Sequence, residues 1–493
     1  MFLTLYLLAL GALVLNAPAQ LWTADSRDFV ILLGLLGVWR WGWQIVQLVR
    51  ALVYRWLVFP RWRAQAEELS EMGPLAPAFF CLTCYRIPPQ TVALALRAAI
   101  QDATAYGGEV TLVVATAERA DQRLAKRVFQ MLRPPQRVRL VLVRRPALGK
   151  RDALAASLAA VRRRLGDEPS FVVALDGDAI VPAGMLARCL PLFRLMPEVG
   201  VLTTDQDCVV EGGPLWREWL LLRFARRDLY ACALGPSRRL LCPTGRMSIY
   251  RAEIATDPAF VARIEDDAIE HWRLGRIPLL TGEDKSAWLQ LLERGRPAML
   301  YVPDVRVATV EHPPERSFAA GSTRLMVRWA GNMLRANGPA RRLGPGRIGA
   351  YLWWSVLDQR VSPWATLVAP LVTVLAVLAG GFVYAYAFLV WVATTRLVQA
   401  LVLGALRGRV SGLWPLLLYW TQLWGALVKI YAQFHPDRQG WTRQGIRARA
   451  ALLGWRLGLR ALGSHSVQVL AFGYFVLTVA WLSRRAGLPV PSW

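Results

Sequence analysis

Long apolar segments at both ends of the chain constrain its fold most, because about 20 consecutive apolar residues suffice to cross a bilayer as a helix. We expect membrane helices at residues 1–17, 29–49, 364–380, 381–403, 413–432 and 466–483. The composition agrees, since 55% of the 493 residues are hydrophobic, against roughly 45–50% in ordinary globular domains. The sequence therefore predicts a multi-pass protein of the lipid bilayer, with one soluble domain between two groups of helices.

Positive charge follows the apolar segments. The formal net charge is +25, from 59 Lys and Arg against 34 Asp and Glu. Arg50, Arg55, Arg61 and Arg63 come directly after the second segment, and basic residues at the ends of membrane helices favour the cytoplasmic side. We therefore expect a cytoplasmic domain, assign most of the charge to topology, and predict no nucleic-acid partner.

One apolar segment does not fit a simple topology. The loops at 404–412 and 433–464 are both basic, and a single crossing at 413–432 cannot leave both of them inside. Either this segment lies at the interface or re-enters, or the number of spans is wrong by one.

Short apolar runs alternate with amphipathic stretches over residues 75–180. Strands are expected at 76–84, 109–116, 138–143 and 171–176, and helices at 89–106, 121–132 and 150–165. Repeated βα units are typical of a mostly parallel sheet covered by helices. We predict an α/β catalytic domain with interfacial helices at 51–345, inserted between N-terminal transmembrane helices (1–50) and C-terminal interfacial and transmembrane helices (346–493). Cys81 and Cys84 are expected to be buried thiols of the first strand, not a metal or redox motif.

An Asp-Gly-Asp tripeptide, Asp176 to Asp178, ends the last of these strands. The carboxyl ends of strands are where α/β sheets bind ligands. Two carboxylates one residue apart suit Mg²⁺ or Mn²⁺, and a divalent cation neutralises a diphosphate leaving group. The motif thus indicates sugar transfer from a nucleotide donor; the alternative is an acidic turn or helix cap.

A second acidic motif, Gly282-Glu283-Asp284, precedes the helix-like run 285–294. An inverting sugar transfer needs one carboxylate to take the proton from the attacking hydroxyl, and Asp284 can fill that role. Judged alone, an acidic N-terminal cap is the favoured alternative.

Two basic motifs complete the candidate site. Lys150 and Arg151 open a helix after a strand, where backbone N–H groups and two cations suit an anion; the alternative is an ordinary loop of charged residues. Arg324 and Arg328 lie on one helical face, where guanidinium groups suit phosphate and the indole of Trp329 suits a sugar ring. An amphipathic helix held at the lipid headgroups is the alternative for the second motif.

The motifs follow one another in a recognisable order. They are Gly149-Lys150-Arg151, Asp176-Gly177-Asp178, Thr244-Gly245, Gly282-Glu283-Asp284 and Arg328-Trp329. This order resembles that of processive family-2 glycosyltransferases, which include cellulose, chitin and hyaluronan synthases. The resemblance is closer to the mannuronan synthase family of bacterial alginate biosynthesis, and runs from about residue 45 to about 445.

The resemblance implies a GT-A fold, GDP-mannuronate as donor, a β-1,4-linked polymannuronate product, and export coupled to synthesis across the bacterial inner membrane. Related bacterial synthases are typically activated by cyclic di-GMP. We find no PilZ-like domain after the membrane segments, so a PilZ-type cyclic di-GMP-binding co-polymerase is expected as a partner, with periplasmic and outer-membrane export components. The alternatives are a synthase of another polysaccharide, hyaluronan-like or chitin-like, or a non-catalytic membrane scaffold.

The resemblance also implies roles for individual residues. Asp176 would bind the nucleotide, Asp178 the metal, and Asp284 would be the base; substrate contacts would come from Glu118, Lys150, Thr244, Gly245, Arg246, Arg328 and Trp329. Leu325 and Gly282 stand where the wider family carries Gln and Thr. Trp441-Thr442-Arg443 resembles a motif of hyaluronan synthases without its Gly.

Three cations outside the acidic motifs are further site candidates. Arg246 could pair with the carboxylate of a uronic acid; a phosphate or a neighbouring acid is an equal alternative. Arg396 and Lys429 fall in the apolar segments, where a buried cation indicates a site, here weak contacts for a departing polyanion. Their alternative is snorkelling to the headgroups.

Overall fold

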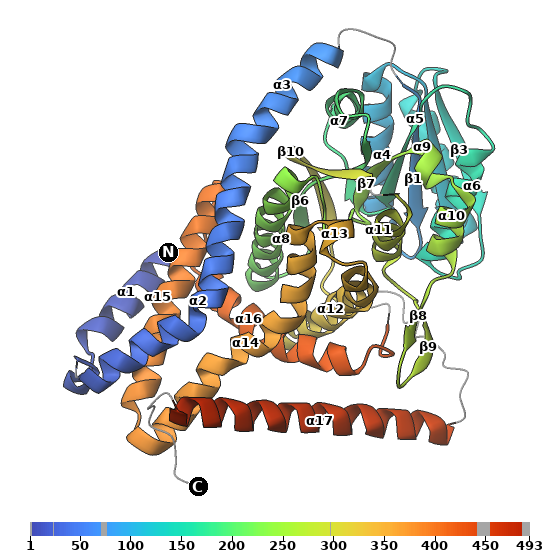
Figure 1. The fold of residues 1–493 in the computed structure, drawn as a ribbon. Helices are drawn as coiled ribbons and strands as arrows, with labels where there is room; N and C mark the ends of the chain where they lie inside the picture. The colour runs from blue at the N-terminus through green and yellow to red at the C-terminus, as the bar shows by residue number, and fades with distance from the viewer. Residues whose placement is uncertain (1, 23, 71–75, 296, 441–453, 486–493) are drawn as a thin grey trace.

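The computed structural model describes residues 2–22, 24–70, 76–295, 297–440 and 454–485. Within these ranges an α/β domain lies beside long helices that come from both ends of the chain (Figure 1). The helices α1 (Phe2–Leu15), α2 (Ala24–Val53), α14 (Ala350–Gly380) and α15 (Val383–Arg407) pack against one another. The predicted arrangement, an α/β domain inserted between two groups of apolar helices, is confirmed.

The domain is built on one mixed sheet with the strand order β3-β2-β1-β4-β7-β6-β10-β5. The strands are β1 (Ala78–Cys84), β2 (Val110–Thr116), β3 (Val138–Arg144), β4 (Phe171–Asp176), β5 (Ala179–Ile180), β6 (Val199–Val210), β7 (Met247–Arg251) and β10 (Ala298–Glu311). The four strands β1 to β4 are parallel neighbours, and β7 pairs antiparallel with both β4 and β6. The predicted strands agree with β1 to β4 to within two residues. Cys81 and Cys84 are buried free thiols of β1, as expected.

Helices cover the sheet because its central strands are apolar on both faces. Every residue of β1 is buried, which is typical of a parallel strand covered on each side. The covering helices are α4 (Pro89–Tyr106), α5 (Arg119–Leu132), α6 (Lys150–Arg162), α7 (Met185–Leu195), α8 (Pro214–Leu234), α9 (Ala252–Ala255), α10 (Pro258–Glu265) and α11 (Glu283–Arg294). A two-stranded sheet, β8 (Ala268–His271) with β9 (Gly275–Pro278), projects beside them (Figure 1).

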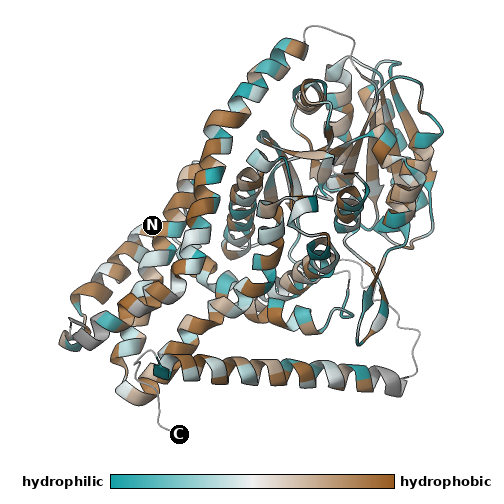
Figure 2. Ribbon diagram, in the orientation of Figure 1, coloured by the Kyte–Doolittle hydropathy of each residue, from teal (hydrophilic) through white to brown (hydrophobic). Residues whose placement is uncertain are grey.

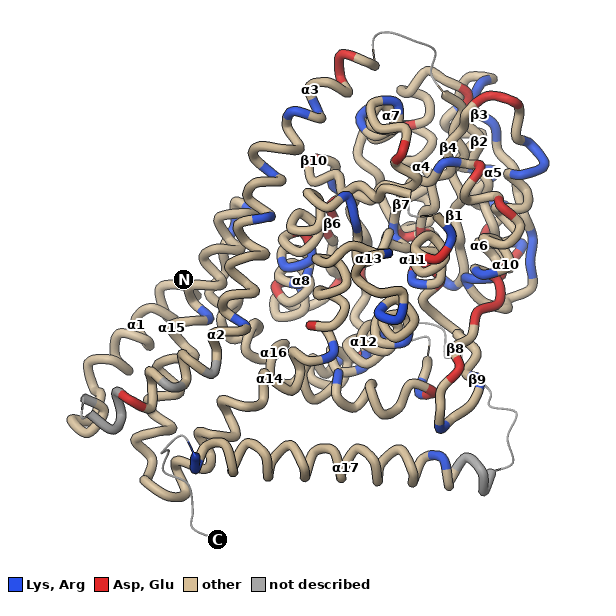
Figure 3. Tube along the Cα trace, viewed as in Figure 1, with Lys and Arg blue, Asp and Glu red and all other residues tan. Residues whose placement is uncertain are grey.

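The C-terminal half continues from the domain as helices. After α12 (Phe318–Arg342) and the short α13 (Pro345–Ile348) come α14, α15, α16 (Trp414–Phe434) and α17 (Gly454–Arg485). By length and composition, three described helices could cross a membrane, namely α14, α15 and the Gly458–Arg485 part of α17. The bent pair Asp28–Leu35 and Gly37–Ser70 would add a fourth. Figure 2 shows the apolar character of α14, α15 and α17, and Figure 3 shows that α17 is almost free of charge between its ends.

Two predicted spans differ from the helices observed. Residues 1–17 form only the 14-residue helix α1, and the 21-residue α16 is not among the described helices that are apolar enough to cross a membrane. The predicted span at 364–380 is the second half of α14, which begins at Ala350. The prediction began too late because the first half of this helix carries polar residues, which are not typical of a membrane helix.

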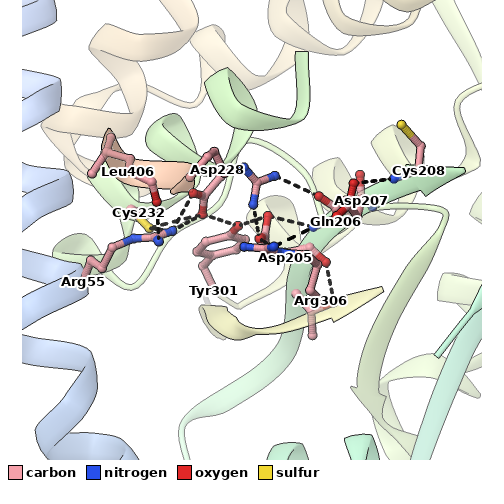
Figure 4. Close-up of polar contacts among 12 residues, drawn as sticks. Arg55, Asp205, Gln206, Asp207, Cys208, Asp228, Cys232, Tyr301, Arg306 and Leu406 are labelled. Atoms are coloured by element: carbon pink, nitrogen blue, oxygen red, sulfur yellow. Dashed lines mark hydrogen bonds and ion pairs between the residues drawn. The ribbon is translucent and has the colours of Figure 1, made fainter. Parts of the chain in front are cut away.

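A buried polar network joins the membrane helices to the domain (Figure 4). Arg55, in the π-helical turn Tyr54–Val58 that follows α2, lies 2.5 Å from the carboxylate of Asp228 in α8. Tyr301 of β10 donates hydrogen bonds to Asp228 at 2.8 Å and to Asp205 of β6 at 3.2 Å. Asp205 also pairs with Arg407 at the end of α15. The network therefore holds α2 and α15 against the sheet.

Replacing Asp228 by Ala is expected to destabilise the protein by about 3–5 kcal/mol, because it leaves the Arg55 guanidinium with an uncompensated charge. The Asp228 side chain is 1% exposed. The measurement is thermal unfolding of the detergent-purified chain. As a control, Glu198→Ala removes the exposed pair of Glu198 with Arg238 and should cost no more than about 1 kcal/mol. Equal melting temperatures for the two variants would contradict a supporting role for the network.

Candidate active site

The Asp-Gly-Asp motif lies where the sequence predicts, at the carboxyl end of β4. Asp176 ends the strand, and the backbone N–H of Gly177 donates to the Thr83 carbonyl at 3.2 Å. A Cβ on Gly177 would stand 2.8 Å from that carbonyl and 2.7 Å from the Cys84 sulfur, so only glycine fits. The carbonyl of Asp178 accepts from Val310 of β10 at 3.1 Å. The backbone therefore fixes both carboxylates at the sheet edge.

Lys150 connects the two acidic motifs. It opens α6, and its Nζ lies 2.6 Å from Asp176 Oδ1 and 2.5 Å from Glu283 Oε1. Burial raises the pKa of Asp176 to about 6; Lys150 opposes this, and Asp178 adds to it. Burial also acts to raise the pKa of Glu283, but the Lys150 ammonium lowers it to about 2. The lysine thus compensates part of the buried negative charge.

The loop of Thr244 and Gly245 closes over this ion pair. Lys150 Nζ donates to the Gly245 carbonyl at 3.2 Å. A Cβ on Gly245 would stand 2.9 Å from both Glu283 Oε1 and Lys150 Nζ, so any larger residue would displace the ends of these two side chains. Thr244 is buried, and its hydroxyl accepts from Gln206 Nε2 at 2.8 Å. The loop therefore joins β6 to the acidic motifs.

Asp284 lies in the first turn of α11 and lines the same cavity as Asp176 and Asp178. The turn before it needs Gly282, whose φ of 86° lies in the left-handed region. Asp284 Oδ1 accepts from the backbone N–H of Lys285 at 2.9 Å, and the Cys242 thiol lies 3.3 Å from Oδ2. The N-cap position is occupied by Gly282 and no side chain caps the helix, so Asp284 is an acid of the first turn that lines the site and not the cap itself.

Arg246 pairs with a protein acid in this structure. Its Nη2 lies 2.6 Å from Glu311 Oε1, and its Nη1 lies 3.4 Å from Gln206 Oε1. Of the three ligands considered from the sequence, the neighbouring acid is the one observed. Both Arg246 and Glu311 line the cavity.

Arg328 and Trp329 of α12 also line the cavity. The Trp329 ring stacks on Trp219 of α8 with centroids 5.7 Å apart, and the Arg223 guanidinium lies 3.4 Å from the Trp329 centroid. Arg324, in contrast, is outside the cavity lining and pairs with Glu315 at 2.9 Å. Of the two arginines in the predicted Arg-x-x-x-Arg motif, only Arg328 therefore lies at the cavity.

Glu118 is the predicted site residue that lies apart from the others. Its side chain is exposed just before α5, and it is not among the described residues that line the cavity, although Thr116 and Ala117 are. Trp441-Thr442-Arg443 lies outside the described residues.

One cavity of about 660 Å³ contains these motifs and extends beyond them. It runs from the strand ends to polar residues of α2, α8, α14 and α16. Sequence reasoning missed the contribution of α8, which is Arg223, Arg226, Arg227 and Tyr230. Their i, i+3, i+4, i+7 spacing marks one helical face and was the available signal.

Comparison with known proteins agrees with this geometry. Residues 77–332 match the family described as glycosyltransferase like family 2. The chain belongs to this family. The matched range begins just before β1 and ends in α12, so this glycosyltransferase carries all five motifs within the family domain.

Two relatives with similar sequences over nearly the whole chain specify the kind of glycosyltransferase more closely. The glycosyltransferase is 39% identical over 453 residues to "Glycosyltransferase alg8" of Pseudomonas syringae pv. tomato, covering 91% of this chain and 92% of that one. It is 36% identical over 475 residues to "Glycosyltransferase alg8" of Azotobacter vinelandii, with 96% of each chain covered. The resemblance to alginate biosynthesis glycosyltransferases seen in the motifs is thereby confirmed.

Among solved structures, a mannosyltransferase from Pyrobaculum calidifontis in complex with GDP-Man and Mn²⁺ is similar with a TM-score of 0.46 and 18% identity, covering 82% of this chain and 98% of that one. In the glycosyltransferase itself, no group of three or more His, Cys, Asp or Glu side chains among the described residues is arranged to hold a metal ion.

Proposed function

We propose that the protein is a processive, inverting glycosyltransferase that polymerises mannuronate from GDP-mannuronate into β-1,4-linked polymannuronate and passes the chain outward. The observation that carries the proposal is the single cavity in which Asp176, Asp178, Asp284 and Trp329 face a common space that continues between the membrane helices. A nucleotide sugar at the strand ends and a growing chain towards α14 and α16 fit this one space.

Asp284 is the proposed base. It would accept the proton of the acceptor hydroxyl as that oxygen attacks the anomeric carbon. Glu283 is unsuited to this task because Lys150 pairs with it at 2.5 Å. The division of labour is therefore that Glu283 holds Lys150 in place while Asp284 takes the proton.

The donor diphosphate is proposed to lie between the strand ends and α8. Asp176 and Lys150 would border the nucleotide, and the loop of Thr244 and Gly245 would cover it, with Arg246 beside it. Arg328 would contact the diphosphate, and Trp329, already fixed by Trp219, would present its ring to the acceptor sugar. Glu118 is proposed to contact the nucleotide from the rim of the cavity.

The acidic pair fits Mg²⁺ or Mn²⁺. Mg²⁺ in particular is commonly bound through one or two carboxylates, substrate phosphates and water, which agrees with the two carboxylates of this pair. Burial raises the pKa of Asp176, Lys150 opposes this, and the neighbouring Asp178 adds to it; a cation held by the pair would favour the charged form of both carboxylates. When bound, the metal would stabilise the charge of the departing diphosphate. Asp178 is the proposed metal ligand.

The membrane helices make the inner membrane the proposed location, with the catalytic domain cytoplasmic. The basic residues after α2 support this orientation. We propose that a PilZ-type cyclic di-GMP-binding co-polymerase and periplasmic and outer-membrane export components act with the protein, and that synthesis drives export.

Donor competition tests the proposal. Membranes containing the chain and its partners are incubated with GDP-mannuronate, GDP-mannose or UDP-linked sugars, and the polymer is analysed. The rate of polymer formation should be roughly 10²-fold or more higher with GDP-mannuronate than with GDP-mannose. A neutral sugar has no carboxylate, so the protein groups that recognise this carboxylate would be left without a partner. Polymer made from a UDP sugar instead would reject the donor and favour a hyaluronan-like or chitin-like synthase. Absence of any transfer would favour the scaffold.

A further inference from the structure

The far end of the cavity has a different chemical character from the strand ends. Five of the acidic residues in its lining lie at the catalytic end, namely Asp176, Asp178, Glu283, Asp284 and Glu311. Among the described residues, the remaining acid of the lining is Asp358 of α14. The cations that surround it come from three other helices and are Arg40 of α2, Arg226 of α8 and Lys429 of α16. This end therefore carries more positive than negative charge.

The three cations are only partly neutralised by protein groups. Arg40 donates to the Ser362 carbonyl at 3.1 Å, and Arg226 to the Tyr230 hydroxyl at 3.3 Å. Lys429 is half-buried and makes no hydrogen bond or ion pair within the described part of the chain. The charged groups that act on it are Arg226, Arg40 and Asp358. Because burying cations without compensation is costly, the cluster calls for an anionic occupant.

Neutral polar groups line the same stretch. Gln359 and Ser362 of α14 and Gln422 of α16 border the cavity. Trp43 of α2 also lines it, and its indole N–H is buried with no hydrogen-bond partner among the described residues. Amide, hydroxyl and indole groups suit sugar hydroxyls and ring faces. The occupant that fits both sets of groups is an anionic sugar.

We infer that Arg40, Arg226 and Lys429 form a product subsite that binds the carboxylate of a uronate residue in the polymer leaving the catalytic centre. The inference rests on the proposed function, which supplies a polyuronate to this end of the cavity. Arg396, the other cation considered from the sequence, does not contribute, because it bonds to Gln399 within α15 and is not among the described residues of the lining. The subsite holds the chain by charge and selects an acidic product.

The test compares two hexasaccharides on the full-length protein in nanodiscs. One is β-1,4-linked hexamannuronate and the other is the same hexamer with its carboxyl groups reduced. Wild type should bind hexamannuronate more tightly, and Lys429→Gln should weaken that binding by about tenfold, the loss of one charged contact. Binding of the neutral hexamer and of GDP should stay unchanged. Lys429→Arg should retain most of the affinity.

The matched control is Arg139→Gln, which removes one positive charge from the exposed side of β3, where Arg139 is 65% exposed, and should change neither affinity. Equal affinity of wild type for the two hexamers, or unchanged hexamannuronate binding by Lys429→Gln, overturns the subsite. The donor assay separates this from the proposed function. If polymer forms from GDP-mannuronate but hexamannuronate binding does not depend on Lys429, the subsite alone is rejected. If hexamannuronate binding depends on Lys429 but no polymer forms from GDP-mannuronate, the subsite is kept and the proposed donor is rejected.

Discussion

Replacing Asp284 by Asn should reduce polymer formation by about 10²–10⁴-fold, the usual contribution of a general base. Asparagine keeps the shape of the side chain and can still accept the hydrogen bond from the Lys285 backbone N–H. It cannot take up the proton of the acceptor hydroxyl. Initial rates with labelled donor measure the effect, and GDP binding to the same preparation should be nearly that of wild type. The loss should therefore appear in turnover.

Asp121→Asn is the matched control for this variant. Asp121 also lies in the first turn of a helix, α5, but outside the described lining of the cavity. It should retain wild-type turnover. A rate for Asp284→Asn within about twofold of wild type would place the base elsewhere, since the amide has no comparable basicity.

Local patterns made the first half of the sheet predictable. Each of β1 to β4 is a short apolar run, and β1, β2 and β3 are each followed by a helix with its own boundary signals. For example, α4 begins with Pro89 at its first position and ends at Gly107, whose φ is 83°. The end of β4 at Asp176 was therefore visible in the sequence, and with it the position of the acidic pair.

Long-range pairing made the second half less accessible. The antiparallel β7 inserts between β4 and β6, and β10 pairs with both β6 and β5. No local pattern specifies such neighbours, because strand order depends on packing between distant segments. The short helix α1 and the early start of α14 were missed for a related reason, since hydropathy alone does not report where a helix begins.

The site was predictable in its motifs but not in its contacts. Asp176, Asp178 and Asp284 line one cavity, as the sequence indicates. The ion pairs of Lys150 with Asp176 and Glu283, which connect the two acidic motifs, became visible only in the fold. Arg246 illustrates the limit. A guanidinium suits a uronate, a phosphate or a protein acid equally well, and the pairing of Arg246 with Glu311 of β10 became visible only in the fold.

Replacing Asp178 by Asn should reduce polymer formation by roughly 10³-fold, because a bound cation contributes several kcal/mol of charge stabilisation to the transition state. In contrast with Asp284→Asn, donor binding should fall as well, since the carboxylate would hold a cation that favours binding of the diphosphate. GDP affinity is measured with Mn²⁺ and with EDTA. Wild type should bind GDP more weakly in EDTA, whereas Asp178→Asn should bind weakly in both.

The comparison forms a thermodynamic cycle between the carboxylate and the cation. If both act through one site, removing the cation costs little once Asp178 is gone, and the two losses are not additive. Asp207→Asn is the control, because Asp207 lies on β6 outside the described cavity lining and bonds to its neighbouring Cys208 backbone N–H. It should respond to EDTA as wild type does. Full wild-type activity in EDTA, or an equal EDTA effect in Asp178→Asn, would show that this carboxylate binds no catalytic metal.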